Sequence, residues 1–413
     1  MEEFQYRGGS LACEGVSLAE LAETYGTPLY VYSETSIRDR FRALDEAYAG
    51  VPHQICYAMK ANDNLAITRL LAGLGAGADI VSGGELFRAR KAGVPADRII
   101  FAGVGKTRAE IAQAIDADVL LFNVESPAEL EAIADVAREK DRVARIAVRV
   151  NPDVDPHTHP YISTGLKQNK FGVPADRVLD VYRRARDDRF LDPVGIQMHV
   201  GSQLVHVQPI VDAVARVVDL VARLRAEGVR LRYFDVGGGL GIRYRDEAPE
   251  GPSDLAERIL PTMRELGVTL LCEPGRFIVG SAGVLLTRVV YRKENGVKTF
   301  VIVDAAMNDL IRPTLYAAHH EVRPVAPVAE QEVVDVVGPI CESGDFFAKD
   351  RCVPVSRAGD LLAIMSAGAY GFVMASTYNA RPRPAEVLVA GSQHRLIRRR
   401  ETYQDLVSAE DGL

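Results

Sequence analysis

Four features of this 413-residue chain carry groups that could do chemistry. Lys60 follows the apolar run ICYAM, and Glu273 follows the run TLLC. His199 follows VGIQM, and the glycine triplet 237–239 follows YFDV. Because a short apolar run is typical of a buried strand, all four features stand where a strand would end. A lone lysine or histidine at such a place is usually structural, but the four together indicate a site.

An amine, a flat ring, an acid and a glycine-rich turn suit one kind of cofactor. The amine of Lys60 could form a Schiff base with an aldehyde. A pyridine ring needs a flat neighbour such as His199, and its nitrogen needs an acidic partner such as Glu273. A phosphate binds backbone N–H groups where no side chain intrudes, as 237–239 and Gly275 would allow. Together these groups predict a site for pyridoxal phosphate.

Other readings of the same residues are weaker. The stretch VGGGLGI does not match a dinucleotide-binding fingerprint, because Ile242 stands where the third glycine belongs. The triplet by itself fits a tight turn equally well. The chain has no P-loop motif and no metal-ligand spacing. The pairs His157/His159 and His319/His320 favour surface or local hydrogen-bonding roles over metal binding, so no metal site is expected.

These residues must be positioned by a scaffold, and the sequence predicts which one. Strand-like runs alternate with helix-like segments, and most of the runs are continuously apolar, as in parallel strands covered on both faces. The eight runs are 55–59, 78–82, 98–103, 118–124, 144–151, 194–200, 233–237 and 269–275. Eight such units predict a (β/α)8 or TIM barrel, in which the C-terminal strand ends form one rim. An open doubly wound sheet is the alternative, but no switch point is evident.

The pattern of residue types in the sequence changes after about residue 280. Segments such as TFVIVDA and QEVVDVVGPI are β-rich and are broken by glycine, proline and charged turns. They predict a second, mainly β domain, and we expect PLYVY near the N-terminus to pair into it. The expected domains are therefore a barrel at 36–279 and a β-rich domain built from 1–35 and 280–413.

The composition of the chain limits the kinds of partner that it is expected to bind. The net charge is −7, which argues against a nucleic-acid or anionic-membrane surface. No apolar segment is long enough to span a bilayer. Five scattered cysteines suggest a reducing compartment rather than a disulfide framework. We therefore expect a cytoplasmic protein with no nucleic-acid or membrane partner.

Several motifs carry a resemblance to a known family. YAMKAN, HVGSQ, DVGGGLG, CEPGR and GAYG occur in order, together with the more selective HPYISTG and CESGD. The chain resembles the fold-type III pyridoxal-phosphate decarboxylases, and among them the diaminopimelate decarboxylase family. The resemblance implies an alanine-racemase-like barrel with pyridoxal phosphate. It also implies decarboxylation of meso-2,6-diaminopimelate to L-lysine and CO2, the last step of lysine biosynthesis.

The resemblance also implies roles for individual residues. Lys60 would hold the cofactor, His199 would stack on its ring, and Cys341 would donate the proton that completes the reaction; these three are the expected catalytic residues. Glu273 would keep the ring nitrogen protonated and so strengthen the electron sink, which favours decarboxylation over racemisation. The phosphate-contacting positions would be Ser202, Gly239, Gly275, Arg276 and Tyr370.

The substrate carries an amino acid group at each end, so its distal end must be recognised as well. Two arginines suit a distal carboxylate because they can contact it bidentately. The implied substrate-binding residues are Arg276, Arg312, Tyr316, Glu342 and Tyr370. The resemblance further implies a homodimer with shared active sites, in which the CESGD loop reaches across from the partner.

Three alternatives stay open at this point. A related decarboxylase of the ornithine or arginine type would share most of these motifs. A non-catalytic pyridoxal-phosphate carrier would typically lack the β domain, and an inactive regulatory relative would usually lack the cofactor lysine. An aldolase-type barrel would use a Schiff-base lysine without a cofactor. The sequence also leaves open whether the loop 157–170 closes over a substrate.

Overall fold

The computed structural model describes residues 4–154 and 169–412 of the chain. Contacts divide the chain into two units. The barrel unit comprises Arg40–Ile242 and Ala248–Phe277, and the β-rich unit comprises Met1–Asp39, Arg243–Glu247 and Ile278–Leu413.

The barrel unit is a closed ring of eight parallel strands. They are β5 (His53–Ala58), β6 (Gly77–Ile80), β7 (Ile99–Phe101), β8 (Leu121–Val124), β9 (Ala144–Asn151), β11 (Leu191–Met198), β12 (Tyr233–Asp235) and β13 (Thr269–Cys272). Neighbouring strands pair in chain order, and β13 pairs with β5 to close the ring. The predicted (β/α)8 barrel is confirmed, and all eight predicted strands are present. A two-residue strand, β10 (Val173–Pro174), adds to β9 outside the ring.

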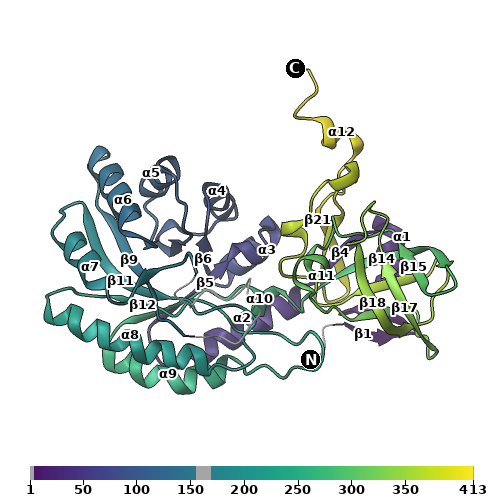
Figure 1. The fold of residues 1–413 in the computed structure, drawn as a ribbon, viewed down its shortest axis with the longest axis horizontal. Coiled ribbons are helices and arrows are strands. Elements are labelled where there is room, and N and C mark those ends of the chain that lie inside the picture. The colour runs from purple at the N-terminus through teal and green to yellow at the C-terminus, as the bar shows by residue number, and fades with distance from the viewer. Residues whose placement is uncertain (1–3, 155–168, 413) are drawn as a thin grey trace. The chain divides into compact units, whose positions relative to one another are not determined.

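Helices follow the strands and surround the ring (Figure 1). Their bounds are α2 (Glu34–Tyr48), α3 (Leu65–Gly73), α4 (Gly83–Lys91), α5 (Arg108–Ala117), α6 (Pro127–Glu139), α7 (Val178–Arg186), α8 (Gln208–Ala226), α9 (Pro252–Leu266) and α10 (Arg276–Val279). Each amphipathic helix covers the outer face of the strands with its apolar side. Because every strand runs in the same direction, their C-terminal ends meet on one rim.

The β-rich unit is built around one large sheet. Its sheet order is β18-β17-β15-β14-β4-β20-β21, and β19 pairs with both β14 and β16. The strands of this sheet are β4 (Leu29–Ser33), β14 (Gly283–Glu294), β15 (Thr299–Val303), β16 (Val322–Pro324), β17 (Gln331–Val337), β18 (Phe346–Pro354), β19 (Leu361–Ile364), β20 (Ala385–Ala390) and β21 (Gln393–Arg398). The unit also contains β1 (Phe4–Arg7), β2 (Ser10–Cys13), β3 (Val16–Ser17), α1 (Leu18–Tyr25), α11 (Arg312–Tyr316) and α12 (Tyr403–Val407).

The N-terminal segment joins this sheet as expected. Strand β4 contains PLYVY apart from its proline and pairs antiparallel with β14 and parallel with β20. Its Leu29 and Val31 pack with Val284 and Val387 in a fully buried core. The prediction that PLYVY pairs into the β-rich part is therefore confirmed.

Several strand boundaries differ from the sequence prediction, and one of these differences involves Lys60. Strand β5 ends at Ala58, and Met59–Ala61 form a 3-10 turn, so Lys60 lies just beyond the strand rather than at its last position. Helix α8 begins at Gln208 and has Pro209 in its first turn.

Two further observations concern the whole described chain. Among the helices within residues 4–154 and 169–412, none has the length and apolar character that crossing a bilayer requires. In the same ranges, no disulfide bond joins any of the five cysteines.

Candidate active site

The amine of Lys60, which follows β5, is held in position by a buried carboxylate. Its Nζ lies 2.6 Å from Oδ2 of Asp79, which is completely buried on β6. The pairing of β5 with β6 sets Ala58 beside Asp79 and so brings the turn that carries Lys60 over this carboxylate. The Lys60 side chain remains 38% exposed. The amine is therefore held by a buried acid and is still open to solvent at the rim.

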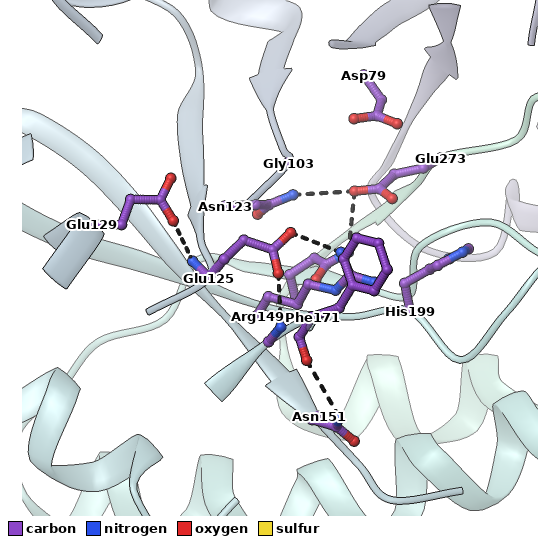
Figure 2. A network of polar contacts seen from close by, with 12 residues as sticks. Asp79, Gly103, Asn123, Glu125, Glu129, Arg149, Asn151, Phe171, His199 and Glu273 are labelled. Carbon is purple, nitrogen blue, oxygen red and sulfur yellow. Dashed lines mark hydrogen bonds and ion pairs between the residues drawn. The ribbon is translucent and has the colours of Figure 1, made fainter. Parts of the chain in front are cut away.

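The acid that follows β13 lies in a polar cluster inside the barrel. Oε1 of Glu273 accepts hydrogen bonds from Nδ2 of Asn123 at 3.1 Å and from Nε2 of Gln197 at 3.3 Å. Figure 2 shows Asn123 pointing toward Glu273, with Asp79 close by. Burial and the charges of Asp235 and Asp79 raise the pKa of Glu273 well above its ordinary value. Its carboxyl group therefore favours the protonated form when it faces no cation.

His199 lies on the same rim, just after β11. Its Nδ1 accepts a hydrogen bond from the backbone N–H of Gly238 at 3.2 Å. Burial lowers the pKa of His199 well below its ordinary value, and the positive charges of Arg149 and Lys60 lower it further. The ring is therefore neutral and carries its proton on Nε2. A neutral, flat ring in this position can lie against an aromatic ligand.

The glycine-rich turn is shaped for close approach of a ligand. Gly239 has a φ of +122°, and a Cβ atom there would lie 2.7 Å from the carbonyl oxygen of Gly201. A Cβ atom on Gly275 would lie 2.9 Å from Cβ of Ala61. Within the described residues, the backbone N–H groups of Gly239 and Gly275 have no hydrogen-bond acceptor. Such N–H groups at neighbouring strand ends can bind an anion.

Two further predicted residues adjoin this turn. Nη2 of Arg276 lies 3.2 Å from Oγ of Ser202, so the two side chains meet across the ends of β11 and β13. Arg276 is buried, with 4% of its surface exposed. The barrel therefore brings together, on one rim, seven of the predicted site residues: Lys60, His199, Ser202, Gly239, Glu273, Gly275 and Arg276.

A second layer of polar residues supports the rim, and sequence reasoning missed it. Nζ of the buried Lys106 donates to the backbone oxygens of Gly103 and Asn123, at 2.7 and 2.8 Å. The hydrogen bond to the backbone oxygen of Asn123 holds the residue whose side-chain amide donates to Glu273. Nη1 of Arg149 pairs with Oε1 of Glu125 at 2.8 Å, and both side chains are buried (Figure 2).

A signal for some of these residues does exist in the sequence. Asp79, Asn123 and Asp235 are single polar residues in otherwise apolar barrel strands, and Gln197 interrupts the apolar end of its strand. Buried polar groups need partners, so such a residue marks a polar interior. The sequence does not say which strands face one another, and the partners could not be named from it.

The predicted substrate arginine lies in the β-rich unit at the start of α11. Arg312 is 5% exposed, and its Nε donates to Nε2 of His320 at 3.3 Å. The guanidinium lies 5.0 Å from the ring centre of Tyr244 and 5.8 Å from that of Tyr316. Burial and Arg312 lower the pKa of His320 to about 3, so this histidine is a neutral acceptor. The expected local hydrogen-bonding role of His320 is confirmed.

The CESGD segment lies in the same unit, between β17 and β18. Cys341 is exposed, and its backbone N–H donates to Oδ1 of Asn379 at 3.0 Å. Asp345 accepts backbone N–H groups from Met307 and Ile340, both at 2.7 Å. These bonds hold the loop that presents Cys341.

Two other predicted residues belong to this unit. Glu342 is exposed and accepts a hydrogen bond from the Tyr378 side chain, which raises the pKa of that tyrosine. Tyr370 has a φ of +54°, an uncommon conformation for a residue with a side chain. The selective motif HPYISTG, the pair His157/His159 and most of the loop 157–170 lie outside the described residues.

The chain is similar to known proteins over its full length. Residues 34–280 match a family described as pyridoxal-dependent decarboxylase, pyridoxal binding domain. The chain is 52% identical to the diaminopimelate decarboxylase of Pseudomonas aeruginosa, with 100% of both chains covered. It is 51% identical to that of Aquifex aeolicus, with 98% of this chain and 96% of the relative covered.

The chain belongs to the diaminopimelate decarboxylase family. A solved structure of the Helicobacter pylori diaminopimelate decarboxylase complexed with L-lysine has 47% sequence identity to it. That match has a TM-score of 0.93 and covers 96% of this chain and all of the other. The chain is therefore a pyridoxal-dependent carboxy-lyase, and the family expected from its motifs is confirmed.

Proposed function

We propose that this member of the diaminopimelate decarboxylase family converts meso-2,6-diaminopimelate to L-lysine and CO2, the last step of lysine biosynthesis. The observation that carries the proposal is the 52% identity to a diaminopimelate decarboxylase over the whole of both chains. The L-lysine complex of a relative at 47% identity supports the same product. The rim residues support the chemistry, since they supply an amine, an acid and an anion site close together.

The rim fits pyridoxal phosphate, which we propose as the cofactor. Lys60 would hold its aldehyde carbon covalently, and Glu273 would face its ring nitrogen. The phosphate would bind at the N–H groups of Gly239 and Gly275, where a side chain would collide with neighbouring atoms. Ser202 and Arg276 adjoin this anion site, and the family resemblance implies Tyr370 as a further phosphate contact.

The bound cofactor would supply the electron sink for the electron pair that remains when CO2 leaves. Asp79 would position the Lys60 amine through the 2.6 Å contact. His199 would lie against the ring and keep water from one face of it. Glu273 would hold a proton at the ring nitrogen, because a buried carboxylate stabilises a cation that faces it. Cys341 would then deliver a proton to the carbon that lost CO2.

Substrate choice would depend on the distal end. The buried guanidinium of Arg312 is held by His320, Tyr244 and Tyr316, which suits a carboxylate that neither ornithine nor lysine carries at its distal end. Arg276 would contribute to the same recognition, and Glu342 would take the distal ammonium group.

We also propose a cytoplasmic homodimer with shared active sites. Cys341 and Glu342 are exposed on the β-rich unit, which supports their use by a second copy of the chain. A mixture of Lys60→Ala and Cys341→Ala subunits would test this sharing, since each mixed dimer would contain one intact composite site. Recovery of activity on mixing is expected, and two inactive variants that stay inactive together would contradict the proposal.

The main experiment is an absorbance spectrum followed by product analysis. Purified protein with pyridoxal phosphate should show an absorption band near the visible edge, and meso-2,6-diaminopimelate should yield L-lysine and CO2. Ornithine, arginine and lysine serve as parallel substrates. Protein that stays colourless with added cofactor would refute the cofactor site, and turnover of ornithine alone would favour the related decarboxylase.

A further inference from the structure

Asp235 is a completely buried carboxylate at the end of β12 to which the mechanism above gives no role. Strand β12 pairs with β13, which leads into Glu273. The backbone N–H of Glu273 donates to the oxygen of Gly237 at 2.8 Å and fixes the two strand ends beside each other. The fold thus sets a second acid next to the one that would face the ring nitrogen.

The two carboxyl groups are bridged by one side-chain amide. Nδ2 of Asn123 donates to Oε1 of Glu273 at 3.1 Å and to Oδ2 of Asp235 at 3.4 Å. Two ionised carboxylates that share one donor in a buried site repel each other, and burial together with the charge of Asp235 raises the pKa of Glu273 well above its ordinary value. One proton shared by the pair removes this repulsion.

We propose that Asp235 and Glu273 act as a single acid that stores one proton while no ring occupies the site and passes it to the ring nitrogen of the cofactor. In this step the O–H bond of Glu273 breaks, its electron pair stays on the carboxylate oxygen, and an N–H bond forms on the ring. The inference rests on the proposed cofactor site. It makes Asp235 a positioning residue that acts through Glu273.

The charges around the pair place the stored proton on Glu273. Burial raises the pKa of Asp235 to about 6, whereas burial and Asp235 raise that of Glu273 well above its ordinary value. Asp79 raises the proton affinity of Glu273 further, and Lys60 opposes it. The thiols of Cys56 and Cys272 also lie near the pair, and burial raises their own pKa values, so they stay neutral.

The cluster is also built to hold the pair after the proton leaves. Asn123 and Gln197 donate to Glu273, and the backbone N–H of Gly237 donates to Oδ1 of Asp235 at 2.9 Å. Two carboxylates then face one protonated ring nitrogen. A second negative charge makes removal of the ring proton harder, and the electron sink is kept in its stronger form.

Infrared spectroscopy of the wild-type protein tests the stored proton directly. At about pH 8, Glu85 and Asp309, whose pKa values are raised to about 7, are mostly ionised, whereas Glu273 is not. Cofactor-free protein should show a carbonyl band of a protonated carboxylic acid. The band should shift when glutamate is labelled with ¹³C, vanish on addition of pyridoxal phosphate and be absent from Glu273→Gln. Absence of the band from the wild type would overturn the inference.

Comparing Asp235→Asn with a matched variant, Asp79→Asn, separates proton sharing from the general effect of a nearby negative charge on the pKa of Glu273. Each removes one buried carboxylate of the barrel, but Asp79 contacts Lys60 rather than Glu273. In Asp235→Asn the band should titrate more than about 1 pH unit lower than in the wild type. Asp79→Asn should shift it by less. Equal shifts in both variants would show that no proton is shared.

Calorimetry with pyridoxamine phosphate, which has no aldehyde to react with Lys60, gives an independent readout. Heats of binding in two buffers of different ionisation enthalpy yield the protons exchanged with solvent. Asp235→Asn should take up more protons on binding than the wild type, by at most one per site. Identical proton counts would overturn the inference. Failure of the wild type to bind either pyridoxal phosphate or this probe would instead refute the proposed function.

Discussion

The two units bury their acids in different ways. In the barrel, the hydrogen bonds to Glu273 come from the side-chain amides of Asn123 and Gln197, and Asp79 meets the amine of Lys60. In the β-rich unit, Asp345 accepts two backbone N–H groups. Both kinds of carboxylate are hidden from water, yet their partners differ.

The partners indicate what each acid does. A carboxylate that accepts backbone N–H groups satisfies donors that folding would otherwise bury, so it stabilises a loop. A carboxylate held by side chains inside a barrel satisfies no backbone group and raises the free energy of the folded state. Such a cost is typical of functional sites. Glu273 and Asp79 are therefore expected to serve chemistry, and Asp345 is expected to serve the fold.

The largest effect is expected at the amine of the barrel. Lys60→Ala removes the covalent attachment, and activity should fall by more than about 10³-fold. The absorption band near the visible edge should vanish, whereas the melting temperature without cofactor should change little. Lys140→Ala, at a partly exposed lysine on the same unit, is the control. A coloured and active Lys60→Ala protein would contradict the assignment of this lysine.

The β-rich unit should matter to chemistry through Cys341. Cys341→Ala should lower kcat by about 10²–10⁴-fold, the usual contribution of a positioned proton donor, while KM and cofactor absorbance stay close to wild type. Cys352→Ala is a matched control, because Cys352 is also exposed on this unit. If both variants keep full activity, the proton comes from another group.

A charged group of the β-rich unit should set substrate affinity. Arg312→Lys keeps the charge but loses bidentate contact, and KM should rise about 10–100-fold, the equivalent of one charged hydrogen bond. The effect on kcat should be smaller. Arg323→Lys, in the neighbouring strand β16, is the control. Unchanged KM in Arg312→Lys would mean that this arginine only stabilises the unit.

Asp345, the buried acid of the CESGD loop, should affect stability rather than cofactor binding. Asp345→Asn leaves one buried N–H without a good acceptor and should destabilise the protein by about 1–3 kcal/mol. Thermal unfolding measures the loss, and Asp350→Asn, at an exposed position, provides the comparison. A change in cofactor absorbance without loss of stability would break the distinction between the two units.

The last prediction concerns the pH dependence of stability at Asp309. Burial raises the pKa of Asp309 to about 7, from an ordinary value of 3.8. Between these values the unfolded chain loses the proton and the folded chain keeps it, so stability falls as the pH rises through this window. Asp309→Asn lacks this fall. As the pH rises from about 5 to about 8, the melting temperature of Asp309→Asn should therefore rise relative to that of the wild type. Parallel profiles of melting temperature against pH would contradict the raised pKa.

Much of the scaffold could be predicted because its signals are local. The run ARIAVRVN predicts a strand at 144–151, and β9 spans Ala144–Asn151. The end of β5 was misplaced, because Met59 continues the apolar pattern although the backbone already turns at the rim. Periodicity reports burial, and a buried turn has the same apolar residues as a strand.

The candidate site was predictable where a motif or a strand end marks it. Lys60, His199 and Glu273 follow strands, and parallel strands bring such residues to one rim. Asp235 and Asn123 could not be paired in advance. They lie 112 residues apart in the chain, and nothing local indicates that their side chains meet inside the closed ring.

The sequence by itself determined the eight βα units, the β-rich partner unit and the residues that stand at the strand ends, because each depends on neighbours along the chain. Only the tertiary structure decided which buried groups touch. It places the carboxylate of Asp79 against the amine of Lys60, and it places the amide of Asn123 between Asp235 and Glu273. The reason is physical, since the strength of a buried charge depends on the distance to other charges and on the water excluded around it. Both are set by closure of the barrel.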